Sequence, residues 1–90
     1  MTEEIKTLRL KNKLGLHARA AATFVKVALQ FKSKIQVEYD GQTVDGESIL
    51  DLLTLACPMG GQLTVKVSGS DAPVAMEELE KLVENKFGED

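Results

Sequence analysis

Hydrophobic and polar residues alternate along four short stretches of the chain, and this period of two is typical of half-buried strands. The stretches are residues 5–12, 35–39, 42–44 and 63–67. Asp40-Gly41 separates the second stretch from the third and is a strong two-residue hairpin signal. We therefore expect the two middle strands to pair as a hairpin.

Three other stretches place apolar residues at helical spacing, which predicts helices over residues 18–29, 48–56 and from 71 to a stop at Gly88. Ser48 begins the second of these with the serine-to-acid spacing of a capping box. Asp71 is the expected N-cap of the third.

The order β-α-β-β-α-β-α predicts an α+β open-faced sandwich, in which a four-stranded, mostly antiparallel sheet carries three helices on one face. Ninety residues are enough for one domain, residues 1–90. A chain of this length buries only ~60% of its unfolded surface, which leaves little room for an internal ligand cavity. We therefore expect its chemistry to lie on the surface, with a partner completing the site.

The composition excludes several classes of protein. No apolar run approaches the ~20 residues that span a bilayer, and the acidic first four residues do not resemble a secretory signal. We expect a soluble, cytoplasmic protein with no membrane insertion. The single cysteine, Cys57, and the single histidine, His17, exclude an internal disulfide and a Cys/His metal cluster, so we expect neither metal nor cofactor. Cys57 is expected to be a small buried residue.

Charge is unevenly distributed along the chain. Residues 5–34 carry eight basic and no acidic side chains, whereas residues 35–90 carry three basic and twelve acidic ones. This pattern suggests a side that faces a phosphate, an acidic protein or nucleic acid, although a merely solvated face would give the same pattern. Nucleic acid is the weakest of these, because no basic stretch is interleaved with aromatic residues.

The only histidine lies where the first strand gives way to the first helix. Backbone N–H groups at a helix start bind phosphate, and Arg19 adds a cation with a bidentate fork. A neutral imidazole nitrogen is nucleophilic near pH 7, so His17 could carry a phosphoryl group there. Gly15 would permit a tight turn before it. Taken alone, His17 could equally be a helix cap or a hydrogen-bonded surface residue.

Residues 15–21 (GLHARAA) resemble the G-L-H-A-R-P-A signature of the HPr phosphocarriers, and residues 46–50 (GESIL) are similar to that family's regulatory-serine segment. The resemblance implies a phosphocarrier of the phosphoenolpyruvate-dependent phosphotransferase system, active in sugar uptake or regulation, and not an independent enzyme. It implies that His17 accepts a phosphoryl group from enzyme I and passes it to EIIA proteins, and that Arg19 stabilises the phosphate. It further implies regulation at Ser48 by an HPr serine kinase. We expect the carrier to be a monomer.

Two residues depart from the family pattern. Ala20 stands where relatives usually have proline, which is a stabilising residue of the first helical turn and does not react. Asp51 stands where relatives often have glycine or lysine, so it places negative charge at the expected docking edge. We therefore expect Asp51 to affect which partner proteins the chain binds.

The helix over residues 48–56 is almost entirely apolar, although a helix packed on one side needs a single apolar stripe. Leu52 and Leu55 are the expected core residues. Ile49, Leu50 and Leu53 are the expected partner-binding patch beside His17. In a purely structural alternative, loops cover these three side chains.

Two alternative functions stay open. The first is a regulatory member of the same family, either of a nitrogen branch or controlled through its serine. The second is a small acylphosphatase-like hydrolase, in which Asn12 would position a water molecule, although the glycine-rich phosphate loop of such enzymes is missing.

Overall fold

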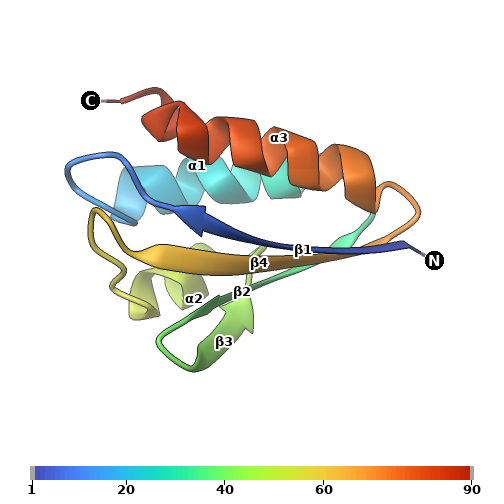
Figure 1. The fold of residues 1–90 in the computed structure, drawn as a ribbon, viewed down its shortest axis with the longest axis horizontal. Coiled ribbons are helices and arrows are strands. Elements are labelled where there is room, and N and C mark those ends of the chain that lie inside the picture. The colour runs from blue at the N-terminus through green and yellow to red at the C-terminus, as the bar shows by residue number, and fades with distance from the viewer. Residues whose placement is uncertain (1, 90) are drawn as a thin grey trace.

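The computed structural model describes residues 2–89 and contains one antiparallel sheet with helices packed against it (Figure 1). The strand order across the sheet is β1-β4-β2-β3, with every neighbouring pair antiparallel. The strands are β1 (Thr2–Arg9), β2 (Lys34–Tyr39), β3 (Gln42–Asp45) and β4 (Gln62–Gly69). The helices are α1 (Ala18–Ala28), α2 (Ile49–Thr54) and α3 (Ala72–Glu84), followed by a 3-10 turn at Lys86–Gly88. The predicted open-faced α+β sandwich is confirmed.

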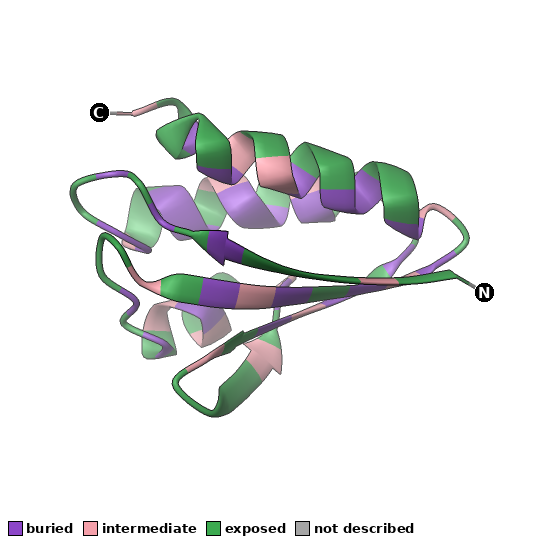
Figure 2. Ribbon diagram, in the orientation of Figure 1, coloured by how far each residue is buried: buried purple, intermediate pink, exposed green. Residues whose placement is uncertain are grey.

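The core lies between the sheet and its helices. Helices α1 and α3 lie side by side over one face, and their buried sides point toward the strands (Figure 2). Every second residue of β2 and β4 points toward these helices and completes the core. This is why hydrophobic residues recur with a period of two in the sequence. The fully buried side chains of these strands are Ile35, Val37, Leu63, Val65 and Val67.

The hairpin between β2 and β3 follows its sequence signal. Asp40 and Gly41 have φ values of 52° and 81°, as a type I′ turn requires at both central residues. The pairing of Tyr39 with Gln42 then sets the register.

The ends of two elements differ from the predictions. β1 ends at Arg9 and not at residue 12, because its partner β4 begins at Gln62, directly opposite Arg9. The last regular helix ends at Glu84 and not at Gly88, because Lys86 and Phe87 adopt left-handed φ values of 57° and 56°. The reversal buries the Phe87 ring against the core.

Asp71 is the N-cap residue of α3, as predicted, but its side chain makes no capping hydrogen bond. Its carboxylate instead accepts the backbone N–H groups of Lys32 and Ser33 at 2.8 and 3.0 Å, together with the Ser33 hydroxyl. Asp71 therefore ties the loop after α1 to the start of α3.

Part of the basic N-terminal stretch is paired with α3. Lys6 binds Glu80 at 2.8 Å and Lys11 binds Glu84, so these two cations cross-link β1 and its following loop to the last helix. Among the helices of residues 2–89, none has a hydrophobic stretch of the length that a bilayer crossing requires.

Candidate functional site

The segment that leads from β1 into α1 is fixed by contacts with the segment that follows α2. The N–H of Leu16 donates to the carbonyl of Cys57 at 2.9 Å, and the Leu16 side chain is buried. Gly15 has φ +64° and lies so close to this segment that an added Cβ would be 2.5 Å from the Cys57 carbonyl oxygen. A glycine is therefore required immediately before the histidine loop.

His17 is the N-cap residue of α1, with extended backbone and no capping bond from its ring. The first hydrogen bond of the helix runs from Ala21 N to His17 O at 2.8 Å, so the N–H groups of the preceding turn are left for an external acceptor. The imidazole is 23% exposed. The ring is therefore free of the capping role and stands beside a helix N-terminus that favours anions.

Glu89 approaches His17 from the other end of the chain. Its Oε1 atom lies 2.6 Å from Nε2 of the imidazole. In Figure 1 the C-terminal end correspondingly lies near the loop that leads into α1. The hydrogen bond from His17 holds the pKa of the Glu89 carboxyl below its usual range, and the Asn12 amide and the charges of His17 and Arg19 act in the same direction. Glu89 is therefore ionised at neutral pH.

Asn12 holds this carboxylate in place. It is fully buried, and its Nδ2 atom donates both to Gly15 O at 2.7 Å and to Glu89 Oε1 at 2.8 Å. Both hydrogens of the amide are engaged, whereas its Oδ1 atom is buried and has no hydrogen-bond partner within the described residues.

Arg19 and Lys13 supply positive charge to the same place. Both are exposed and line an open hollow of about 560 Å³ together with Leu14, Gly88 and Glu89. Within residues 2–89, neither cation forms an ion pair. Two cations and the Glu89 carboxylate therefore face this hollow.

Ser48 caps the neighbouring helix as its spacing predicts. Its hydroxyl accepts the N–H of Asp51 at 3.2 Å. The second half of the capping box is not formed, because the Asp51 carboxylate accepts the N–H of Asp45 at 3.4 Å instead. No hydrogen bond joins Ser48 to His17 within the described part of the chain.

The apolar residues of α2 divide unevenly between core and surface. Leu52 and Leu55 are buried, as predicted. Ile49 and Leu50 are 39% and 76% exposed, also as predicted. Leu53, in contrast, is half-buried against the core, so the exposed patch that the structure shows on α2 consists of Ile49 and Leu50.

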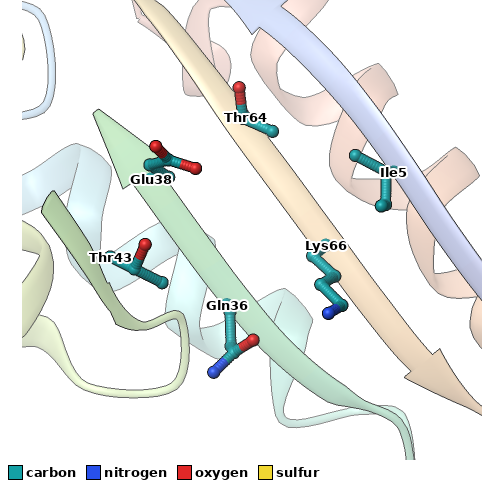
Figure 3. Close-up of a pocket in the computed structure, with 6 residues that line it drawn as sticks. All are labelled: Ile5, Gln36, Glu38, Thr43, Thr64 and Lys66. Atoms are coloured by element: carbon teal, nitrogen blue, oxygen red, sulfur yellow. The ribbon is translucent and has the colours of Figure 1, made fainter. Parts of the chain in front are cut away.

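Two other features do not form a reactive site. Cys57 is buried as predicted, and burial raises the pKa of its thiol to about 11, so it stays protonated. On the sheet face away from the helices is a groove of about 370 Å³ (Figure 3). The residues that line this groove come from the strands, and they include neither histidine nor cysteine. They are Ile5, Gln36, Glu38, Thr43, Thr64 and Lys66.

Sequence reasoning missed Glu89 and the role of Asn12. The turn-forming segment at residues 12–15 marked Asn12 as a loop residue but not as a buried donor. No local signal identifies Glu89, because its partner His17 lies 72 positions earlier.

Comparisons with known proteins identify the chains to which this sequence and fold are similar. Residues 5–85 match the family model for the PTS HPr component phosphorylation site. The chain is 41% identical to the phosphocarrier protein HPr of Cupriavidus necator over 87% of this chain and 88% of that protein. It is also 41% identical to the HPr-like protein Crh of Halalkalibacterium halodurans, over 90% of this chain and 96% of that one.

Among solved structures, HPr-C-His from Thermoanaerobacter tengcongensis superposes with a TM-score of 0.91 at 41% identity. The superposition covers 100% of this chain and 99% of that structure. The similarity therefore extends over the loops around His17 as well as over the sheet and helices.

Proposed function

The chain belongs to the HPr family of phosphocarriers of the phosphotransferase system, and from this premise we propose that His17 accepts a phosphoryl group from enzyme I and passes it to EIIA proteins. The observation that carries the proposal is the placement of a part-exposed imidazole at the start of α1, ahead of the first helical hydrogen bond at Ala21 N. The proposed carrier is a single domain that acts as a cytoplasmic monomer.

The proposed transfer needs no catalytic group beyond those around the ring. A lone pair of the imidazole forms the nitrogen–phosphorus bond while the bond between phosphorus and the donor protein breaks. The helix N-terminus and the Arg19 guanidinium face the three phosphoryl oxygens and compensate their charge. The stabilisation from the helix end is small, about 0.3–1 kcal/mol, so the group stays transferable.

Incubation of the purified protein with enzyme I and phosphoenolpyruvate tests the proposal. Mass determination should find one acid-labile phosphoryl group per chain, and His17→Ala should carry none while keeping the native circular dichroism spectrum. Arg19→Ala should accept the group more slowly, since Arg19 compensates charge and forms no bond to phosphorus. Acceptance by the His17→Ala variant at the native rate would exclude the assignment.

The regulatory member of the family is the second candidate, and the similarity to the HPr-like protein Crh is the observation that favours it. Transfer from the phosphorylated chain to a panel of purified EIIA proteins distinguishes the two candidates. Rapid transfer to sugar-specific EIIA proteins supports the carrier. A chain that is phosphorylated but donates only to a nitrogen-branch EIIA supports the regulator.

We propose Ser48 as the regulatory phosphorylation site and Ile49 and Leu50 as part of the enzyme I docking surface. A phosphate on Ser48 would lie at the start of α2 beside these two exposed side chains. When a partner protein covers the patch, the phosphate would have to give up its hydration. The free-energy cost of this desolvation weakens docking.

A further inference from the structure

Leu14 is an exposed apolar residue at the corner of a tight turn beside the candidate site. The N–H of Gly15 donates to the carbonyl of Asn12 at 3.1 Å, so Lys13 and Leu14 occupy the two corner positions of a β-turn. The Leu14 side chain is 69% exposed and lines the hollow that also contains Lys13 and Arg19. Turn corners usually carry polar residues, glycine or proline. The exposure of this leucine excludes a role in the core.

Met59 occupies a corner of a second turn. The N–H of Gly61 donates to the carbonyl of Pro58 at 2.9 Å, and Gly60 takes the other corner with φ +87°. The Met59 side chain is 55% exposed, so it too contributes little to the core. Each turn therefore presents one large apolar side chain to solvent.

The two turns pack against each other. An added Cβ on Gly15, in the first turn, would lie 2.8 Å from the Cα atom of Pro58, in the second. The second turn is also held to the end of the first strand, because the N–H of Gly60 donates to the carbonyl of Leu10 at 2.7 Å. Figure 1 shows the loop after β1 and the loop before β4 side by side at one end of the sheet. The two exposed side chains thus project from adjacent turns, whereas singly scattered apolar residues would need no explanation.

We propose that Leu14 and Met59, called here the turn pair, form an apolar contact for the protein that donates the phosphoryl group. The inference rests on the proposed function and deepens it, because it assigns chain-specific residues to the donor's docking surface. It extends the surface proposed for Ile49 and Leu50 beyond α2.

The charges beside the turn pair determine which occupant fits. Because Leu14 shares its hollow with Lys13 and Arg19, a molecule that covers the turn pair also faces these two cations. The occupant must therefore combine an apolar surface with an anionic group, and a protein that delivers a phosphoryl group to His17 has both. A second copy of this chain, docked through the same surface, would instead bring two more cations to the contact.

The apolar and the charged contacts should respond differently to salt. Covering the turn pair removes apolar surface from water, which depends little on ionic strength. Attraction between the donor's anionic group and the cations Lys13 and Arg19 is screened by salt. The turn pair is therefore the salt-insensitive part of the contact.

Steady-state phosphorylation by enzyme I and phosphoenolpyruvate, with the carrier as the varied substrate, tests the proposal. Leu14→Ser and Met59→Ser remove apolar surface at turn positions that accept serine. Ile5→Ser and Val74→Ser are the matched controls, since both side chains are 57% exposed. Ile5 lies on the open face of the sheet (Figure 3) and Val74 lies in the first turn of α3.

Two further measurements show that the variants are intact. Thermal melting confirms that each is folded. Phosphoramidate, a small donor that phosphorylates imidazole and releases ammonia, measures the reactivity of His17 without any partner protein. All variants should react with phosphoramidate at the rate of the wild type.

Leu14→Ser and Met59→Ser should each raise KM about fivefold and leave kcat unchanged, which corresponds to a loss of about 1 kcal/mol in binding free energy. The increase should persist at high salt. Lys13→Gln should raise KM mainly at low salt. Leu14→Met keeps the apolar surface and should retain the wild-type KM, as should the Ile5 and Val74 variants.

A wild-type KM for both turn variants, or an equal increase in the two controls, would overturn the inference and leave the proposed function intact. Slower reaction of the turn variants with phosphoramidate would also overturn it, because the turn pair would then act on the histidine and not on docking. If phosphoramidate phosphorylates the wild type but enzyme I does not, the proposed function fails, and the turn pair loses its occupant.

Discussion

The backbone N–H of Leu16 donates to the carbonyl oxygen of Cys57 at 2.9 Å and so joins the loop before α1 to the segment after α2. This bond fixes the direction in which the chain enters α1, and it therefore fixes where the next residue, His17, presents its ring. The position of the histidine depends on two loops that lie some forty residues apart in the sequence.

We expect Gly15→Ala to destabilise the protein and to slow phosphorylation of His17. The new Cβ would meet the Cys57 carbonyl at 2.5 Å and the Pro58 Cα at 2.8 Å, on top of the unfavourable positive φ. A loss of about 1–3 kcal/mol in the free energy of unfolding is expected from urea titration.

Gly41→Ala is the matched control, since Gly41 has φ +81° and no heavy atom within 4 Å of an added Cβ. It should cost about 1 kcal/mol and leave phosphorylation unchanged. Equal effects of the two variants on phosphorylation would contradict the prediction.

Ala20→Pro should stabilise the protein by about 0.4–1 kcal/mol, because proline restricts the unfolded chain. Ala20 lies in the first turn of α1, ahead of the first helical hydrogen bond at Ala21 N, so no bond is lost. Ala22→Pro, two residues further on, is the control. It removes an interior helical hydrogen bond and should cost about 3 kcal/mol. Thermal melting of both variants measures the difference, and a lower melting temperature for Ala20→Pro would show that its burial leaves no space for the ring.

Stability at acid pH should depend on Asp71. The hydrogen bond from the Ser33 hydroxyl, followed by the Lys32 N–H, holds the pKa of the Asp71 carboxyl below its ordinary value of 3.8. A carboxyl whose pKa is lowered by folding contributes stability above the unfolded pKa and loses it as pH falls through the folded one. The free energy of unfolding should therefore decline as pH drops below about 3.8.

Asp71→Asn should remove this part of the acid dependence and lower stability at neutral pH. Ser33→Ala should produce a smaller change of the same kind, and the double variant should be less than additive. Chemical unfolding measured from neutral pH down to pH 3 tests both expectations. An unchanged acid dependence in Asp71→Asn would assign the effect to other carboxyl groups.

Substitutions at Ser48 should distinguish its role as the N-cap of α2 from its proposed role as a regulatory phosphorylation site. Ser48→Ala removes the acceptor of the Asp51 N–H and should cost about 0.5–2 kcal/mol. Ser48→Asp retains an acceptor at the helix start, so its melting temperature should stay near that of the wild type, while phosphorylation of His17 by enzyme I should slow strongly. Rates are compared at the same low carrier concentration, where docking limits the reaction. Equal rates for Ser48→Asp and wild type would leave Ser48 as a cap only.

The two faces of α2 should respond differently to charge. Leu50→Asp places a carboxylate on a side chain that is 76% exposed, so it should weaken enzyme I binding without unfolding the domain. Leu53→Asp buries part of a carboxylate against the core and should lower the melting temperature. Isothermal titration with enzyme I and thermal melting distinguish the outcomes. Unchanged binding by a folded Leu50→Asp variant would place the docking surface elsewhere.

The elements and their order could be predicted from local sequence patterns. Alternation in β2 and β4, the Asp40-Gly41 turn and the serine cap of α2 are set by local backbone and burial preferences, and a local pattern can report them. The same holds for His17 at the start of α1, because the strand-to-helix transition and the glycine before it are adjacent in the chain.

The surroundings of that histidine depend on long-range contacts that no local pattern reports. The Glu89 carboxylate, the buried Asn12 amide and the Cys57 carbonyl reach the site from segments far apart in the sequence, and each contact depends on how the loops pack. The half-burial of Leu53 and the use of Asp71 as a loop anchor have the same origin. Local propensity specifies which residues can cap, turn or face a core, but long-range packing selects the partners that they meet.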